Sequence, residues 1–346
     1  MLAITATASR RSRRAISKSL SMISAREIVE NPDRPNIKLY RHKVPSFSTV
    51  SEIFAWLLKT EARTIIFTKT IKDCAKVYVS LQDHMQNSVD MFHSCSTDIT
   101  KERIRTDMAD PNGKFRVLVA TDAAGMGVNF AGISCVVNYG PPAELDALLQ
   151  HIGRAGRDGS PASHLLLFNG RQVRNCSAEI LNYVRVNQCL RKCLLEPYNC
   201  SPIMPVSHSC CDFCAKECNC NDEHDHEAHP ATMSVEAVEH EDWWHLSQED
   251  LDSIRSDIIA YRASLPSSSL VPLNLSSGLS NAVIDQLLST ANKIVSAEDI
   301  LLLCPGIGSY GLAKDVWEIM CGIIEDAVIE EDDDNDYIDD DDKLFV

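Results

Sequence analysis

The stretch "FRVLVATDAAGMGVN", residues 115–129, decides the fold class of this chain. Its first part is a short apolar run with β-branched residues, which is typical of a buried strand. The loop that follows carries Gly125 and Gly127, where the absence of side chains lets backbone amides approach a phosphate. A tight turn needs the same glycines, so the stretch by itself indicates a strand and a loop and leaves their function open.

Similar apolar runs alternate with amphipathic runs on both sides of this stretch. Such alternation predicts an α/β fold, with a parallel sheet that carries helices on both faces. Ligands of such sheets bind beyond the carboxyl ends of the strands. We expect strands at 37–44, 63–68, 89–93, 115–121, 134–140 and 162–168, and helices at 48–61, 71–85 and 98–110.

The pattern changes after Phe168, and the rest of the chain is expected to be mostly helical. Helices are predicted at 171–196, 247–263 and 281–327, with a Cys/His-rich loop region at 197–230 and a Ser/Pro-rich link near 264–278. The acidic end should be disordered, because it cannot bury apolar surface against its own repulsion. The domains expected are 1–43, an N-terminal remnant and linker; 44–170, the α/β domain; 171–220, a metal-binding module; 221–329, an acidic helical region; and 330–346, a disordered tail.

Charge is divided unevenly along the 346 residues, whose formal net charge is −16. Residues 1–215 hold 27 Lys and Arg against 19 Asp and Glu, whereas residues 216–346 hold 6 against 30. The mildly basic part is compatible with a polyanionic partner, which the acidic part would repel. No apolar run reaches the roughly 18 residues of a membrane span, so no membrane partner is expected. The N-terminal apolar residues precede the basic ones, the reverse of a secretion signal.

A second informative stretch is "LQHIGRAGRDGSP", residues 149–161. Arg154 and Arg157 are three residues apart, and we expect them to share one face of a helix. A planar, permanently charged guanidinium suits a site where negative charge is spread over phosphoryl oxygens. A solvated basic face is the alternative, but the glycines beside both arginines are costly in a solvated helix.

Together these stretches resemble a known family. "TDAAGMGVN" followed by "QHIGRAGRDG" resembles motifs V and VI of superfamily 2 helicases, and the order of further segments is similar to the RecQ family of 3′–5′ DNA helicases. The resemblance covers residues 1–215, and Ala124 departs from it, since RecQ relatives usually carry an aromatic residue there. The further segments are "LAITATAS" (2–9, motif III), "NPDRPNIKLY" (31–40), "TIIFTKT" (64–70, motif IV) and "FHSCSTDITKERI" (92–104). Because motif III ends the first lobe of such helicases, the resemblance implies that 1–43 is a remnant of that lobe with a linker.

The resemblance implies a RecA-like fold and a role for each matching residue. Arg154 and Arg157 would reach the γ-phosphate of ATP, bound with Mg²⁺ on another lobe, and Arg157 is the preferred arginine finger. Gln150 would couple the nucleotide to the cleft. For His93, a satisfied histidine at a strand end is an equal alternative. The expected ATP-binding residues are Asp122, Gly125 and Gly127, and the expected contacts to the DNA backbone, which do not read sequence, are Thr68, His93, Ser94, Thr121 and Asn129.

Eight of the fourteen cysteines lie from Cys189 to Cys220, which favours a local metal site over a disulfide scaffold. Cys211 and Cys214 form a Cys-x-x-Cys pair. The RecQ resemblance implies a structural zinc site formed by Cys189, His208, Cys211 and Cys214, with Cys210 as the competitor for the fourth place. Thiols without metal are the alternative. A second metal site within 218–229 is conceivable, but we expect a solvated loop there.

ATP hydrolysis also needs a Gly-Lys-Ser/Thr loop, and the printed sequence has none. Its sole Gly-Lys pair, Gly113-Lys114, falls between elements of the α/β domain. We therefore expect the C-terminal lobe of an ATP-dependent 3′–5′ DNA helicase of recombination and repair, without DNA-stimulated ATPase activity by itself.

The alternative function is a non-enzymatic remnant that binds nucleic acid or protein. "LLCPGIGSYG" (302–311) faintly resembles a DNA-binding helix-hairpin-helix turn, though a plain helix-to-helix connection is favoured in so acidic a segment. "RRSRR" (10–14) is either a nuclear import signal, which would place the protein in the nucleus, or the start of a solvated helix.

Overall fold

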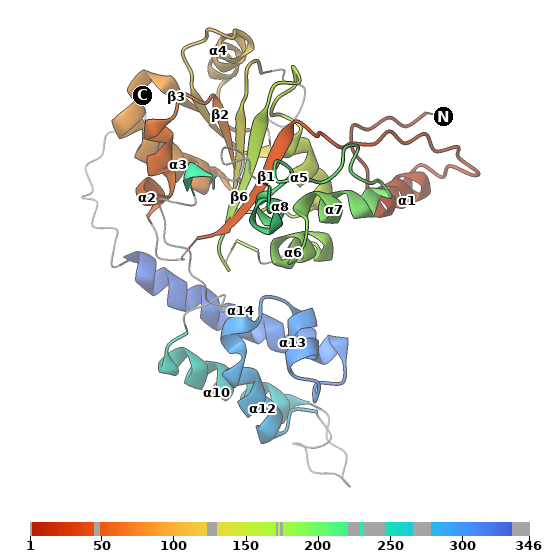
Figure 1. Ribbon diagram of the computed structural model, residues 1–346. Coiled ribbons are helices and arrows are strands. Elements are labelled where there is room, and N and C mark those ends of the chain that lie inside the picture. Colours follow the sequence, from red (N-terminus) through yellow and green to blue (C-terminus); the bar gives the residue numbers. More distant parts are fainter. Residues whose placement is uncertain are drawn as a thin grey trace. The chain divides into compact units, whose positions relative to one another are not determined.

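The chain forms two compact units, residues 1–238 and 239–346 (Figure 1). The structure is a computed structural model. It describes residues 2–44, 49–122, 130–170, 172–173, 176–220, 229–231, 246–265 and 278–333, with side chains up to residue 324. Among these residues, no helix combines the length and apolar character needed to span a bilayer.

The first unit is built on a six-stranded sheet in the order β1-β6-β5-β2-β4-β3, in which every neighbouring pair is parallel. This confirms the predicted α/β class. The strands are β1 (Ile37–Lys43), β2 (Thr64–Thr68), β3 (Val89–Phe92), β4 (Val117–Ala120), β5 (Cys135–Tyr139) and β6 (Ala162–Phe168). Strands β2 and β4 are fully buried, which explains why their sequences are continuous apolar runs without alternation.

Of the three helices predicted between these strands, two form with nearly the predicted bounds and one is shorter. Helix α3 (Ile71–Met85) has the predicted bounds and packs on β2, β3 and β4, while α4 (Asp98–Ala109) contacts β3 and α5 (Leu145–Ile152) contacts β5. The helix expected at 48–61 is shorter. It begins after Thr49, whose side chain forms a capping box with Glu52, and after α2 (Val50–Phe54) it tightens into a 3-10 helix, Ala55–Lys59.

The helix expected at 171–196 is interrupted. Helix α6 (Ala178–Arg185) ends at Val186, and α7 (Leu190–Leu195) begins after Cys189, which has extended backbone angles. Helix α8 (Asp212–Glu217) then docks on β1, where the Leu39 amide donates to the Cys210 carbonyl at 3.1 Å and the Arg41 amide donates to the Asp212 carboxylate at 3.0 Å. The break places Cys189 close to the α8 cysteines. The basic residues 10–14 begin another short helix, α1 (Arg10–Ser19).

The second unit is a small helical domain of α10 (Gln248–Ser264), α12 (Asn281–Ser289), α13 (Ala297–Leu303) and α14 (Tyr310–Asp333). Gly306, in the connection between α13 and α14, lies so close to Val283 that an added Cβ would approach its Cγ2 to 2.5 Å. This close packing accounts for the glycine without a ligand. Helix α14 includes residues 330–333, which were expected to be disordered, while 334–346 and most of the Ser/Pro-rich link lie outside the described residues.

Two residues of the short segment 229–231, His229 and Ala231, are buried in the core of the first unit. The His229 ring packs edge-on against Trp56 and Tyr40, with centroids 4.8 and 5.0 Å away, and its Nε2 lies 3.9 Å from the Cys135 Sγ. Sequence reasoning had placed His229 in a solvated loop. Burial lowers the pKa of His229 from 6.5 to about 4, so the ring is neutral at pH 7.

The buried His229 should make the stability of the first unit fall in mild acid. The unfolded chain takes up this proton near pH 6.5 and the folded chain only near pH 4, so falling pH favours the unfolded state across this window. The contribution is up to about 1.4 kcal/mol per pH unit. His229→Phe keeps an aromatic ring beside Trp56 and cannot titrate.

The measurement is urea unfolding at pH 7.5, 6 and 5. We expect the free energy of unfolding of His229→Phe to decrease less than that of the wild type between pH 7.5 and 5. Equal decreases in the two proteins would show that His229 takes up no proton on unfolding.

Candidate functional site

Arg154 and Arg157 lie in the loop 153–159 that follows α5, hereafter the arginine loop. Helix α5 ends at Ile152, so the expectation that both arginines share a helix face is wrong. The reason is Gly156, whose φ of +50° belongs to the left-handed region that favours glycine. An added Cβ there would lie 2.5 Å from the Asn36 side chain and 2.7 Å from the Ser160 carbonyl. The glycines therefore shape a turn.

The segment 33–36 holds the arginine loop in place. Arg34 Nη2 donates to the Gly156 carbonyl at 2.6 Å. Asn36 Nδ2 donates to the same carbonyl at 2.9 Å and to that of Ser160 at 2.8 Å. Two side chains thus converge on one carbonyl, which fixes the turn between the two arginines.

Positive charge gathers at this loop. Burial lowers the pKa of Arg154, and the neighbouring Arg157 lowers it further. Burial and then Arg34 lower the pKa of Arg157. The three guanidiniums remain charged and oppose one another, and a phosphate group placed among them would relieve that opposition.

The arginine loop lies at the amino ends of β1, β5 and β6. The Gly156 amide donates to the carbonyl of Ile133, just before β5, and the Ala162 amide donates to that of Asn36, just before β1. Four residues predicted to contact DNA lie at the opposite, carboxyl edge. Thr68 ends β2, His93 and Ser94 follow β3, and Thr121 follows β4, on three adjacent strands.

Accessibility distinguishes these four residues. Thr68 is buried and donates through Oγ1 to the Thr70 carbonyl at 3.1 Å, whereas Ser94 is exposed. His93 and Thr121 are partly exposed, and the His93 Nδ1 has no hydrogen-bond partner among the described residues. That observation does not support the alternative of a satisfied histidine at a strand end. Asn129, Gly125 and Gly127 lie outside the described residues.

A polar chain runs from Asp122, at the carboxyl edge, into the buried part of the sheet. His151 on α5 donates through Nε2 to Asp122 at 3.1 Å and accepts at Nδ1 from Asn138 on β5 at 2.9 Å. The Asn138 carbonyl oxygen accepts in turn from His164 Nε2 on β6 at 3.1 Å. The hydrogen bond from His151 lowers the pKa of Asp122, and burial lowers that of His164 to about 3. The Phe67 ring stacks on His151 at 3.8 Å.

The N-terminal segment contacts α5 directly. Gln150 donates through Nε2 to the Thr7 hydroxyl at 2.9 Å. One turn earlier, Asp146 accepts from the Ser9 amide at 2.9 Å and from the Tyr198 hydroxyl at 2.5 Å. The segment that resembles motif III thus reaches the helix that leads into the arginine loop.

The sole Gly-Lys pair forms no phosphate-binding loop. Gly113 lies in the turn before β4, where an added Cβ would meet the Asp107 carbonyl at 2.1 Å and the Arg63 side chain at 2.7 Å. Arg63 fills this turn and donates to the carbonyls of Asp110 and Phe115 at 2.6 and 3.0 Å. The space beside Gly113, where a phosphate would have to lie, is therefore filled by Arg63 and the Asp107 carbonyl.

Four cysteines converge between α7, α8 and β1. The Sγ atoms of Cys189 and Cys210 are 3.6 Å apart and those of Cys211 and Cys214 are 3.4 Å apart, and all four lie within 4.8 Å of one another. These four residues are hereafter the inner cluster. Two zinc-bound sulfurs in a tetrahedron are about 3.8 Å apart, so the residues fit a Zn²⁺ ion. Hydrogen bonds from Cys210 and then Cys211 lower the pKa of Cys189.

The structure places Cys210, and not His208, with the three cysteines expected to bind zinc. His208 instead lies beside Cys218 and Cys220. Its position follows from the backbone, because the Cys210 carbonyl is fixed on β1 and the chain has turned away by His208. Sequence reasoning preferred His208 from the spacing of the family motif, which cannot show which way the chain turns.

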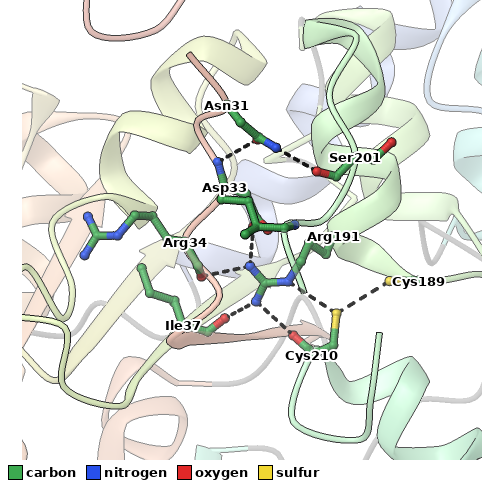
Figure 2. A network of polar contacts seen from close by, with 9 residues as sticks. Asn31, Asp33, Arg34, Ile37, Cys189, Arg191, Ser201 and Cys210 are labelled. Atoms are coloured by element: carbon green, nitrogen blue, oxygen red, sulfur yellow. Dashed lines mark hydrogen bonds and ion pairs between the residues drawn. The ribbon is translucent and has the colours of Figure 1, made fainter. Parts of the chain in front are cut away.

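Arg191 connects the inner cluster to the segment 33–36 (Figure 2). Its guanidinium pairs with Asp33 at 2.6 Å and donates to the carbonyls of Arg34, at 2.8 Å, and of Ile37. Its Nε donates to the Cys210 Sγ at 3.3 Å. Burial disfavours the charge, but hydrogen bonds to Asp33 and Cys210 raise the pKa of Arg191. Sequence reasoning missed this residue, since a single arginine on a helix carries no signal.

Comparisons with known proteins identify relatives of the domain that holds the parallel sheet and the arginine loop. Residues 46–159 match the helicase conserved C-terminal domain family. A putative ATP-dependent RNA helicase of Acanthamoeba polyphaga mimivirus is 29% identical over 238 residues, 63% of this chain and 42% of that protein. The ATP-dependent DNA helicase hus2/rqh1 of Schizosaccharomyces pombe is 28% identical over 169 residues, 48% and 12% of the two chains.

A bacterial relative extends the comparison. The ATP-dependent DNA helicase RecQ of Pasteurella multocida is 28% identical over 169 residues, 49% of this chain and 26% of that protein. The chain therefore spans less than half the length of each of these three relatives.

Replacing Arg191 should destabilise the first unit strongly. Arg191→Met leaves the buried carboxylate of Asp33 without its cation, which costs about 3 kcal/mol or more. The matched control is Arg11→Met, which removes an exposed pair with Glu179 and should cost less than about 1 kcal/mol. Urea unfolding measures the free energy of unfolding of both variants. Equal decreases in the two would show that the buried pair of Arg191 contributes no more than the pair of Arg11.

Proposed function

We propose that this chain, the C-terminal portion of a RecQ-like superfamily 2 helicase, supplies the arginine half of an ATP-hydrolysing site. The observation that carries the proposal is the arginine loop. Arg34 and Asn36 hold the Gly156 turn rigidly, and three guanidiniums lie around it. A preorganised cluster of this kind stabilises the charge that develops as a terminal phosphate leaves, without the cost of reorganisation during the reaction.

In this proposal ATP and Mg²⁺ are bound by a first lobe, and Arg154 and Arg157 complete the site. Arg157 is the finger, because its side chain is exposed while Arg154 is partly buried beneath the turn. Gln150 supports the same site through its contact with Thr7. Asp122 stays a proposed ATP-binding residue, and its carboxylate is held by His151, whose Nε2 lies 3.1 Å away.

The carboxyl edge of β2, β4 and β3 is the proposed DNA-binding edge. Its residues offer hydroxyls, an imidazole and backbone amides, which contact phosphates without reading sequence. Lys101 adds a positive charge there, because its Nζ donates to the Ser94 carbonyl at 2.8 Å. ATP-driven movement of this edge along a strand would give 3′–5′ DNA unwinding of the kind used in recombination and repair.

The inner cluster is the proposed structural zinc site. Four protein ligands leave no open position for chemistry, and such sites stabilise the fold. Four thiolates on Zn²⁺ would carry two negative charges, which the Arg191 guanidinium 3.3 Å from Cys210 would partly offset. Nuclear import by "RRSRR" also stays a proposal. Within that segment Arg13 is engaged with Glu27 and the Ala8 carbonyl in α1, so the helix alternative accounts for at least this residue.

Reconstitution with a first lobe tests the proposed function. The chain is mixed with the separately produced first lobe of a RecQ helicase, single-stranded DNA and ATP, and phosphate release is measured. The chain alone should show no turnover, and the mixture should show DNA-stimulated turnover. Arg157→Ala should reduce the turnover of the mixture by about 10³-fold.

Two controls make the result specific. Arg11→Ala removes an exposed arginine far along the chain and should leave turnover unchanged. Arg157→Lys keeps the charge but not the planar fork, and should recover little activity. ATP turnover by the chain alone that depends on Arg157, or full activity of Arg157→Ala in the mixture, would contradict the proposal.

A further inference from the structure

We propose that His208, Cys218 and Cys220, hereafter the outer cluster, form a second zinc site distinct from the inner cluster. The His208 Nδ1 lies 3.6 Å from the Cys218 Sγ and 3.2 Å from the Cys220 Sγ. The three ligand atoms all lie within 4.8 Å of one another. Sequence reasoning predicted a solvated loop at 218–229 and assigned His208 to the structural zinc site. The proposed function above uses none of these three residues.

The distances fit a tetrahedral zinc ion. Zinc binds sulfur at about 2.3 Å and nitrogen at about 2.0–2.1 Å, which separates a bound nitrogen from a bound sulfur by about 3.5 Å. The two observed separations lie within about 0.3 Å of this value. Thiolate and imidazole are also the ligand types that select zinc over magnesium or calcium.

The local fold explains how these residues meet. His208 comes before the inner cysteines Cys210 and Cys211, and Cys218 comes directly after α8, where its extended backbone turns the chain. Both ends of the segment 208–220 therefore return to one place, while its middle is fixed on β1 through Cys210 and Asp212. The outer cluster closes the segment that the inner cluster anchors.

The two clusters differ in what they offer a metal ion. The inner cluster has four sulfurs, three of them on buried residues. The outer cluster has three ligands among the described residues, and Cys220 is exposed. Three ligands leave one corner of a tetrahedron for water or another donor. The outer zinc should therefore exchange more readily than the inner one.

Zinc counting on the full chain tests the second site. The chain is purified under reducing conditions with zinc, dialysed against metal-free buffer, and analysed by mass spectrometry of the metal. The wild type should hold two zinc ions per chain, and His208→Ala and Cys220→Ser should each hold one. A chelator should remove the outer ion first. Cys95→Ser, which changes an exposed cysteine outside both clusters, should keep two.

Further variants separate this proposal from the zinc site of the proposed function. Cys211→Ser should lose the inner ion and keep the outer one. If this variant keeps both ions, the inner site is contradicted and the outer site is not affected. Circular dichroism should show that His208→Ala and Cys220→Ser remain folded, since both residues are at least partly exposed. A single zinc ion in the wild type that Cys211→Ser loses, outer variants that hold as much zinc as the wild type, or a Cys218–Cys220 disulfide in the reduced chain would overturn the second site.

Discussion

The buried guanidinium of Arg191 is the interaction on which the arrangement of the first unit depends. It is the counter-charge of Asp33, and it donates to the backbone carbonyls of Arg34 and Ile37 and to the Cys210 sulfur. A charge removed from water must be compensated almost completely, and here four partners from two segments, 33–37 and the one that holds Cys210, do so. The start of β1, helix α7 and the cysteine segment are consequently fixed together by one side chain (Figure 2).

The position of the arginine loop also depends on this interaction. Arg191 fixes the backbone of segment 33–36, and from the same segment Arg34 and Asn36 bind the Gly156 carbonyl. The cysteine cluster and the arginine loop are thus two ends of one continuous polar network. A zinc ion in the inner cluster would then do more than stabilise the local fold, because it would help to fix the turn between Arg154 and Arg157.

The apolar patterns predicted the six strands and the bounds of helix α3, because these elements follow local patterns in the sequence. What failed depends on contacts between distant segments. The turn at Gly156 is imposed by Asn36, the fourth cysteine by the docking of Cys210 on β1, and the burial of His229 by the space between Trp56 and Tyr40. None of these leaves a periodic signal in the sequence.

The arginine loop and Asp122 lie at opposite edges of the sheet, and helix α5 contributes to both places. The arginine loop lies at the amino ends of β5 and β6, whereas Thr121 and Asp122 follow the carboxyl end of β4. His151 links Asp122 to Asn138 near the carboxyl end of β5, with its ring stacked on Phe67. Because a buried hydrogen-bonded ring has few alternative positions, a shift of α5 toward a nucleotide would be transmitted to Asp122 and not absorbed locally. Under the proposed function, α5 would in this way connect the arginine loop that follows it with the carboxyl edge of the sheet.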